Sequence, residues 1–271
     1  MMRWAVTGAL LGGTAVAVAC APAAWLASAV AAASAQRLLL ADARGTVWQG
    51  SAVLVLAGGA GSRSASALPG RLRWTLGLDG RALGVRAQQD CCINGELRLR
   101  VSPGWGRIRL ELLAAGLAAW PGADAALGQW PASWLVGLGA PWTTLQPTGS
   151  LQLSSPGLAI EQVQGRWLFS GRADLDVASL GSRLSSLDVL GSYRLSLSGD
   201  AARGELPHLQ LRTRSGALQL TGDGQWTLDG SAAQLHFNGS AAAAPGAEEA
   251  LGGLLNIIGR RQGALSVISI G

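Results

Sequence analysis

The sequence contains no lysine and few charged residues of any kind. All 21 basic residues are arginine, and charged residues make up only 14% of the 271 positions. Without lysine, the chain cannot contain the GxxxxGK(S/T) loop that cradles nucleotide phosphates. The low charged fraction also fits poorly with a fully soluble enzyme that has a large charged surface.

The arginines are spread along the chain, although they outnumber the acids and give a net charge of +5. Several occur two residues apart, a spacing that places both side chains on one face of a strand. These pairs indicate the solvent side of an amphipathic sheet, and they are Arg71/Arg73, Arg98/Arg100, Arg107/Arg109 and Arg212/Arg214. A nucleic-acid site would concentrate basic groups beside aromatic platforms, so we expect no nucleic-acid partner.

Residues that commonly catalyse reactions or bind metals are also scarce. The two histidines, His208 and His236, take polar positions in strand-like runs and have no partner at metal-ligand spacing. The sequence has no GxSxG motif to place a nucleophilic serine on a sharp turn. Asp174 and Asp176 lie on one face of a predicted strand, and we interpret them as surface residues. We expect no enzyme, no cofactor and no metal site. A hydrolase would require a cleft that brings a histidine beside a serine and a carboxylate.

Three cysteines are too few for a disulfide scaffold. Cys20 lies in an apolar stretch, whereas Cys91 and Cys92 are adjacent. Neighbouring Cα atoms are about 3.8 Å apart, below the usual range of about 4.4–6.8 Å for bridged residues. A bridge would therefore need a turn, for which Asp90 and Asn94-Gly95 supply suitable residues. Export to an oxidising compartment favours the bridge, whereas the short distance between neighbouring Cα atoms opposes it. The sequence therefore does not decide whether Cys91 and Cys92 form a disulfide.

An uncharged run of 32 residues, 4–35, follows Arg3 and precedes Arg37. A membrane span needs about 20 apolar residues, so the run predicts one transmembrane helix over residues 4–35. Arg3 favours a cytoplasmic N-terminus under the positive-inside rule. Residues 1–3 would then form a cytoplasmic tip, and residues 36–271 would be translocated.

A cleaved signal peptide is the alternative interpretation of the same run. Arg3 would form its charged start, and Ala33-Ser34-Ala35 has the small-residue form of a cleavage site. The apolar part of a signal peptide is normally about 7–15 residues, so the length favours an uncleaved anchor. Either interpretation exports the domain that follows.

Two details inside the run concern helix packing. Gly8 and Gly12 form a GxxxG pair, which lets two membrane helices approach closely and would allow a homodimer. Pro22 leaves one carbonyl unpaired in the bilayer. It therefore marks the outer end of the embedded part, with Trp25 near the headgroups.

Beyond residue 37, apolar residues alternate with polar ones, which predicts strands with one buried and one wet face. The predicted strands are 45–57, 71–78, 96–101, 107–112, 150–153, 166–173, 193–197, 209–214, 217–220, 225–228, 234–237 and 264–270. Turn residues punctuate them at 102–104, 155–157, 198–200, 222–224 and 229–230. We predict a mainly β domain over residues 36–271. Its strands would form a long antiparallel meander, either a curved open sheet or a flattened barrel, with one or two short helices.

Two segments break the alternation. Residues 120–142 contain four tryptophans, and Trp130 and Trp134 would share a face of a short helix beginning near Pro131. Such a cluster either packs over the end of the sheet or forms an exposed partner surface of Trp130, Trp134 and Trp142. Residues 248–262 predict a second helix, with Glu248 and Glu249 at its start and Arg260 and Arg261 at its end. Its apolar stripe is Leu251, Leu254, Leu255 and Ile258.

An ordered set of short motifs resembles one known family. These motifs are GTVWQG at 45–50, LPGRLRW at 68–74, CCING at 91–95, PASWLVGLGAPWTTLQPTG at 131–149, and LLNIIGRR at 254–261 through Ile270-Gly271. The chain resembles protein N of the type II secretion system, an inner-membrane component of the general secretion pathway of Gram-negative bacteria. No single motif carries chemistry, but together they run from residue 45 to the end.

The resemblance implies a single-pass inner-membrane protein with a short cytoplasmic N-terminus and a periplasmic β domain. It also implies an accessory role in exporting folded periplasmic proteins across the outer membrane, through contact with the secretin or the inner-membrane platform. The family supplies no catalytic residues. The alternative is a lipid- or lipoprotein-handling module, because a curved sheet with one apolar face could offer that face as a groove to an acyl chain.

Overall fold

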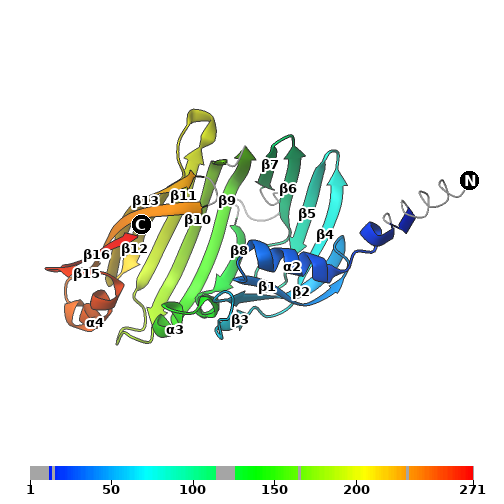
Figure 1. Cartoon of the computed structure of the whole chain (residues 1–271). Helices are drawn as coiled ribbons and strands as arrows, with labels where there is room; N and C mark the ends of the chain where they lie inside the picture. The colour runs from blue at the N-terminus through cyan, green and yellow to red at the C-terminus, as the bar shows by residue number, and fades with distance from the viewer. Residues whose placement is uncertain (1–11, 14–15, 114–125, 164–165, 230–231, 271) are drawn as a thin grey trace, which may run out of the picture.

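The fold is one large antiparallel sheet, seen in a computed structural model that describes residues 12–13, 16–113, 126–163, 166–229 and 232–270. The sixteen described strands all join this sheet (Figure 1). They are β1 (Leu38–Gly45), β2 (Gln49–Ala57), β3 (Ala65–Ala67), β4 (Leu72–Asp79), β5 (Ala82–Gln88), β6 (Leu97–Gly104), β7 (Arg107–Leu113), β8 (Ala126–Pro131), β9 (Pro147–Val163), β10 (Arg166–Ser182), β11 (Gly191–Asp200), β12 (His208–Gly216), β13 (Leu218–Asp229), β14 (Ala232–Ala243), β15 (Arg260–Gln262) and β16 (Leu265–Ile270).

The strand order follows the chain closely. It runs β1-β2-β4-β5-β6-β7-β9-β10-β11-β12-β13-β14-β16-β15, with β3 beside β2 and β8 beside β9. Residues 12–13 and 16–19 are helical, and the helical segments that follow are α2 (Ala23–Ala33), η1 (Ala132–Leu138), α3 (Trp142–Leu145), η2 (Ala201–Arg203) and α4 (Glu248–Ile258). The predicted antiparallel, mainly β fold is confirmed. The sheet is curved and open rather than a closed barrel (Figure 1).

One face of the sheet is apolar along its whole width because cross-strand partners share a face. Leu76 lies opposite Val85, Val85 opposite Leu99, and Leu99 opposite Leu112. Leu112 in turn lies opposite Leu158 of β9. The same face continues on the C-terminal strands through the neighbours Leu175, Leu195 and Leu211.

A β-bulge in β9 keeps this face continuous. The turn predicted at residues 155–157 is wrong, since β9 runs through it without a break. Ser154 lies opposite Asp174 and Gly157 opposite Arg172, so β9 has one more residue here than β10. The Ser155 hydroxyl donates to the Arg172 carbonyl at 2.5 Å. The extra residue brings Leu158 back to the face that Leu153 occupies, and Pro156 is tolerated because a bulge interrupts regular pairing.

The turn predicted at residues 222–224 is also wrong. The predicted strands 217–220 and 225–228 are one strand, β13, and Gly222 and Gly224 lie inside it. Phe237 of the neighbouring β14 explains them. A Cβ on Gly224 would lie 2.9 Å from Phe237 Cδ2, and one on Gly239 would lie 3.0 Å from Phe237 Cε1. The glycines therefore make room for a buried aromatic ring rather than for a turn.

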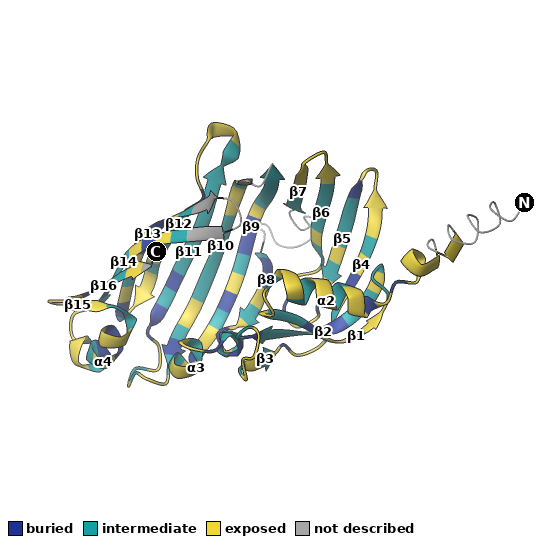
Figure 2. Cartoon of the chain, in the orientation of Figure 1, coloured by how far each residue is buried: buried dark blue, intermediate teal, exposed yellow. Residues whose placement is uncertain are grey.

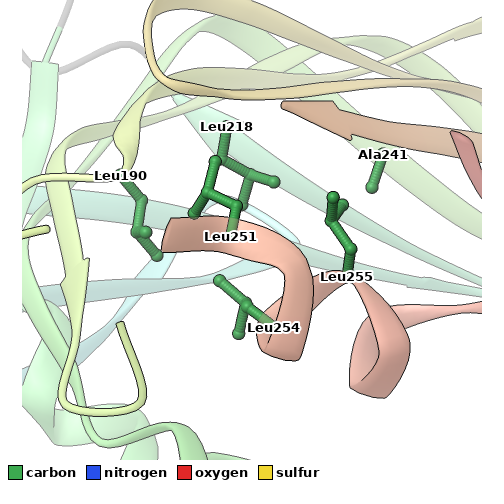
Figure 3. Close-up of a cluster of buried hydrophobic side chains, with 6 residues drawn as sticks. All are labelled: Leu190, Leu218, Ala241, Leu251, Leu254 and Leu255. Carbon is green, nitrogen blue, oxygen red and sulfur yellow. The ribbon is translucent and has the colours of Figure 1, made fainter. Parts of the chain in front are cut away.

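Helix α4 covers the C-terminal end of the apolar face. Leu251, Leu254 and Leu255 are buried against Leu218 and Ala241 of the sheet (Figure 3). The predicted apolar stripe is therefore the packed face of the helix. The helix ends at Ile258, however, and Arg260 and Arg261 form β15 instead of its last turn.

Helix α2 covers the N-terminal end of the same face. Its Ala23 is buried with Leu40, Ala52 and Trp74 of β1, β2 and β4. The helix starts after Pro22, which forms an isolated bridge with Thr46. The prediction placed residues 4–35 in one membrane helix, whereas residues 23–33 pack on the sheet. No described helix is long and apolar enough to cross a membrane.

The GxxxG pair is only partly visible. Gly8 lies outside the described residues, while Gly12 is helical and exposed. A Cβ on Gly12 would have no neighbour within 4 Å among the described residues. Trp25, in α2, is 61% exposed.

Both edges of the sheet carry features that discourage pairing with another sheet. In β1 the pairing register shifts between Ala41 and Arg44, and Asp42 within this bulge has a φ of 49°. Arg71 donates to the Asp42 carboxylate at 2.7 Å and fixes the bulge. The other edge, β15, is three residues long and carries two arginines. Bulges, charges and short edge strands are the usual protection against edge-to-edge association.

We predict that Gly224→Val destabilises the domain by about 1–3 kcal/mol, because the added methyl groups would overlap the Phe237 ring. Gly77→Ala is the matched control, since it is also a strand glycine and has open space around it. Denaturant unfolding of the purified protein measures both. Equal stability of the Gly224→Val variant and the parent would contradict the packing role of the glycines.

Candidate binding surfaces

The face opposite α2 and α4 is polar, and many of its charges are paired. The Asp176 carboxylate accepts from Arg194 at 2.6 Å and lies 3.2 Å from Arg214. For Asp174, burial raises the pKa, but hydrogen bonds from Arg172 and Ser196 outweigh it and hold the pKa below its usual range. The two aspartates that were predicted to lie on the surface thus form ion pairs with arginines of the same face. Such pairs are typical of the solvated face of a sheet.

Both histidines lie on this polar face. His208 and His236 are on β12 and β14, each opposite Gln225 of the intervening strand. His208 Nε2 is 3.8 Å from Asp223. Among the described residues, no cluster of three or more His, Cys, Asp or Glu side chains could hold a metal ion.

Cys91 and Cys92 form a disulfide in a turn that lies between β5 and β6 and pairs with β8. Their Cα atoms are 3.7 Å apart, and the Gln89 carbonyl accepts from the amides of Cys92 and Ile93. The following residues pair with β8: Gln129 N donates to Cys92 O at 2.8 Å, and Asn94 N donates to Leu127 O at 3.0 Å. The motif therefore joins the N-terminal half of the sheet to β8. This position gives it a structural role.

The tryptophan-rich segment forms the predicted short helix next to Pro131, as the 3₁₀ helix η1. The prediction that Trp130 and Trp134 share a face of this helix is wrong, because Trp130 is extended in β8, which pairs with β9 as far as Pro131. Trp134 Nε1 donates to the Ser66 carbonyl at 3.0 Å, which seats η1 over β3. Trp130, Trp134 and Trp142 are all half-buried. Packing over the end of the sheet accounts for Trp134, while a partner surface formed by the three stays a prediction.

A different set of side chains is fully exposed at the ends of the hairpins. Trp105, in the turn between β6 and β7, is 103% exposed. Leu78, Ile108 and Trp167 lie at the same end of neighbouring hairpins and are also exposed. We call these four residues the hairpin margin. Sequence reasoning interpreted Ser102-Pro103-Gly104 as a turn but overlooked Trp105 beside it, although a tryptophan within a turn has no neighbouring strand to cover it.

Between α2 and α4 lies an apolar surface whose side chains are only partly covered. We call it the open apolar face. It comprises Leu83, Val85, Leu99, Val101, Leu110, Leu112, Leu158, Ile160, Leu175, Leu195, Leu197, Leu209 and Leu211. All are of intermediate exposure, as the mostly teal bands of the central strands in Figure 2 show. Side chains of neighbouring strands cover the sides of these residues, so the ends of their side chains stay accessible.

Comparison with known proteins gives one match. The sequence model of the family described as type II secretion system (T2SS), protein N, matches residues 36–267. No curated protein and no solved structure matches the chain. The match includes every strand from β1 to β15, the disulfide turn, and η1 and α3 of the tryptophan-rich segment. The chain therefore belongs to the type II secretion system protein N family.

Proposed function

We propose that this type II secretion component is an accessory protein of the inner membrane that acts by protein–protein contact. Its β domain would lie in the periplasm and assist the export of folded proteins across the outer membrane. The partner would be the secretin or the inner-membrane platform. Family membership supports the secretion role, and the fully exposed Trp105 is the observation that supports a contact surface.

The packing of α2 supports an anchor that is retained. Cleavage after Ala35 would remove α2 and uncover Leu40, Ala52 and Trp74, which it buries. At the end of the uncharged run before Pro22, Trp48 Nε1 donates to Val18 O at 2.8 Å and Val47 N donates to Ala21 O at 2.8 Å, so these residues contact the β domain. We therefore place α2 in the exported domain and the membrane-embedded part ahead of these contacts, in the uncharged run that follows Arg3.

A matched pair of α2 variants tests this division. Ala27 packs against the core under the helix, whereas Ala29 is exposed. Ala27→Asp should destabilise the mature protein by about 1–3 kcal/mol, because it pushes a charge against apolar side chains, and Ala29→Asp should have little effect. Denaturant unfolding of protein purified from membranes gives both values. If neither variant differs from the parent, and the mature N-terminus is residue 36, the run is a signal peptide.

Trp105 is the side chain we place at the centre of the partner contact. Exposed tryptophans are enriched among residues that dominate binding energy. Trp105 lies at a hairpin tip, where it can enter a pocket without disturbing the sheet. Trp142 of the predicted surface is half-buried by comparison.

Photo-crosslinking in intact envelopes distinguishes the two tryptophans. A photoreactive amino acid at position 105 should form an adduct with a secretin or platform component, and one at Thr221, exposed on the polar face, serves as the control. An adduct formed only from position 142 would instead assign the contact to the tryptophan-rich segment. Absence of a protein adduct from either position, with secretion unchanged in Trp105→Ala and Trp142→Ala variants, would overturn the proposal.

Replacing Trp105 should weaken the contact without affecting the fold. Trp105→Ala should reduce partner affinity by roughly 30-fold, as expected for a loss of about 2 kcal/mol at a hot spot. Trp105→Phe should retain most of the affinity. Because the side chain is fully exposed, the unfolding midpoints of both variants should match that of the parent.

The uncovered apolar face favours lipid handling as a second function. The two functions would use different surfaces of the same domain.

A further inference from the structure

We propose that the open apolar face binds the acyl chains of a membrane phospholipid. This inference goes beyond the secretion role and does not depend on Trp105 contacting a protein. It follows from the chemistry of the face, its width, the residues at its margin and the way the protein's own helices cover its two ends.

The face offers no hydrogen bond to an occupant. Its side chains are aliphatic, and the polar atoms of nearby aromatic residues are used internally. The Tyr193 hydroxyl donates to Leu218 O at 2.9 Å, and Trp74 Nε1 donates to Val47 O at 3.0 Å. The backbone groups of the central strands pair with one another in the sheet. An occupant must therefore be apolar and must need no polar partner.

The protein's own helices cover only the two ends of the apolar face. Helix α2 packs on β1 and β2, and α4 packs on β14, β15 and β16. The central strands present Leu at successive inward positions, such as Leu195, Leu197, Leu209 and Leu211. These side chains are of intermediate exposure, and flexible hydrocarbon chains can fill the furrows between them.

The dimensions of the face suit a lipid with two acyl chains. Strands β5–β7 and β9–β12 are adjacent in the sheet, and at about 4.8 Å per strand they span roughly 29 Å. Chains that start at the hairpin margin would run along the strands, and strands of 7 to 10 residues such as β7 and β11 are roughly 24–34 Å long at about 3.4 Å per residue. The hydrocarbon core of a bilayer is about 30 Å thick and holds two chain lengths, so one acyl chain is about 15 Å long and fits along the strands. The width leaves room for both chains of a phospholipid side by side.

An arginine beside the hairpin margin supplies the charge that a phosphate headgroup needs. Leu78 and Ile108 extend the apolar face to the hairpin ends, and the exposed Arg81 lies in the turn that follows Leu78. Arginine pairs well with phosphate oxygens. The exposed Trp167 lies at the same end, and indoles favour the boundary between hydrocarbon and headgroups. At the other end of the strands, η1 packs against β2, β3 and β9. The lipid would thus lie with its headgroup at the margin.

Photo-crosslinking to lipid tests the proposal in intact cells. A photoreactive amino acid is placed at Leu110 or Leu197 on the open apolar face, and at Ser198 on the polar face as the neighbouring control. Cells are labelled with radioactive phosphate, irradiated, and the full chain is purified under denaturing conditions. We expect phospholipid label at positions 110 and 197 at least about tenfold above position 198, a difference of ~1.4 kcal/mol in occupancy. Equal labelling at all three positions, or adducts with a protein instead, would overturn the proposal.

A pair of charge substitutions provides an independent measurement. Leu197→Asp places a carboxylate on the open apolar face, and Ser198→Asp places the same group on the polar face. Lipid that co-purifies with the detergent-solubilised full chain should fall about tenfold for Leu197→Asp and stay at the parent level for Ser198→Asp, as measured by mass spectrometry. An unchanged lipid content in a folded Leu197→Asp variant would contradict the proposal. Because these variants leave Trp105 in place, loss of lipid with normal secretion would separate this function from the protein contact.

Discussion

The structure depends on keeping every inward side chain of a very wide sheet on one face. Because side chains alternate along a strand, a slip of one residue between any two neighbours would turn leucines to the wet side and arginines to the core. The register holds from Leu76 on β4 to Leu211 on β12. Rows of paired charges on the opposite face, such as Arg194 with Asp176, add a second constraint in the same direction.

Local irregularities maintain this register rather than disturb it. The bulge at Pro156 absorbs one residue so that β9, which is 17 residues long, pairs with β7, β8 and β10 without changing faces. The glycines under Phe237 let one aromatic ring cover three strand positions that would otherwise be bare backbone. The disulfide turn at Cys91 and Cys92 connects the short β8 to the N-terminal strands. A meander of regular strands without the bulge, the glycines and the disulfide turn would not have these contacts.

A sheet of this width has more apolar surface than its own helices cover. Helices α2 and α4 complete the core at the two ends, where Ala52 and Ala241 allow close approach. The middle keeps its leucines partly exposed, and its hairpin ends carry exposed aromatic and aliphatic residues. An accessory protein at a membrane could use these two surfaces separately, one for a protein and one for lipid. Both proposals rest on the same fact: the apolar area of the sheet is larger than the area that the two helices cover.

The sequence by itself determined the mainly β class, the wet and dry faces and the family, because alternation and short motifs are local properties of the chain. It also predicted the packed stripe of α4. It did not predict β1, whose LLLADARG lacks alternation, or that Ser155-Pro156-Gly157 and Gly222-Asp223-Gly224 lie inside strands. Turn residues and bulge residues are the same types, and only the neighbouring strand distinguishes them. Likewise, Pro22 marked a break, but only the packing of Ala23 and Ala27 on Leu40 and Trp74 assigned the helix after it to the domain.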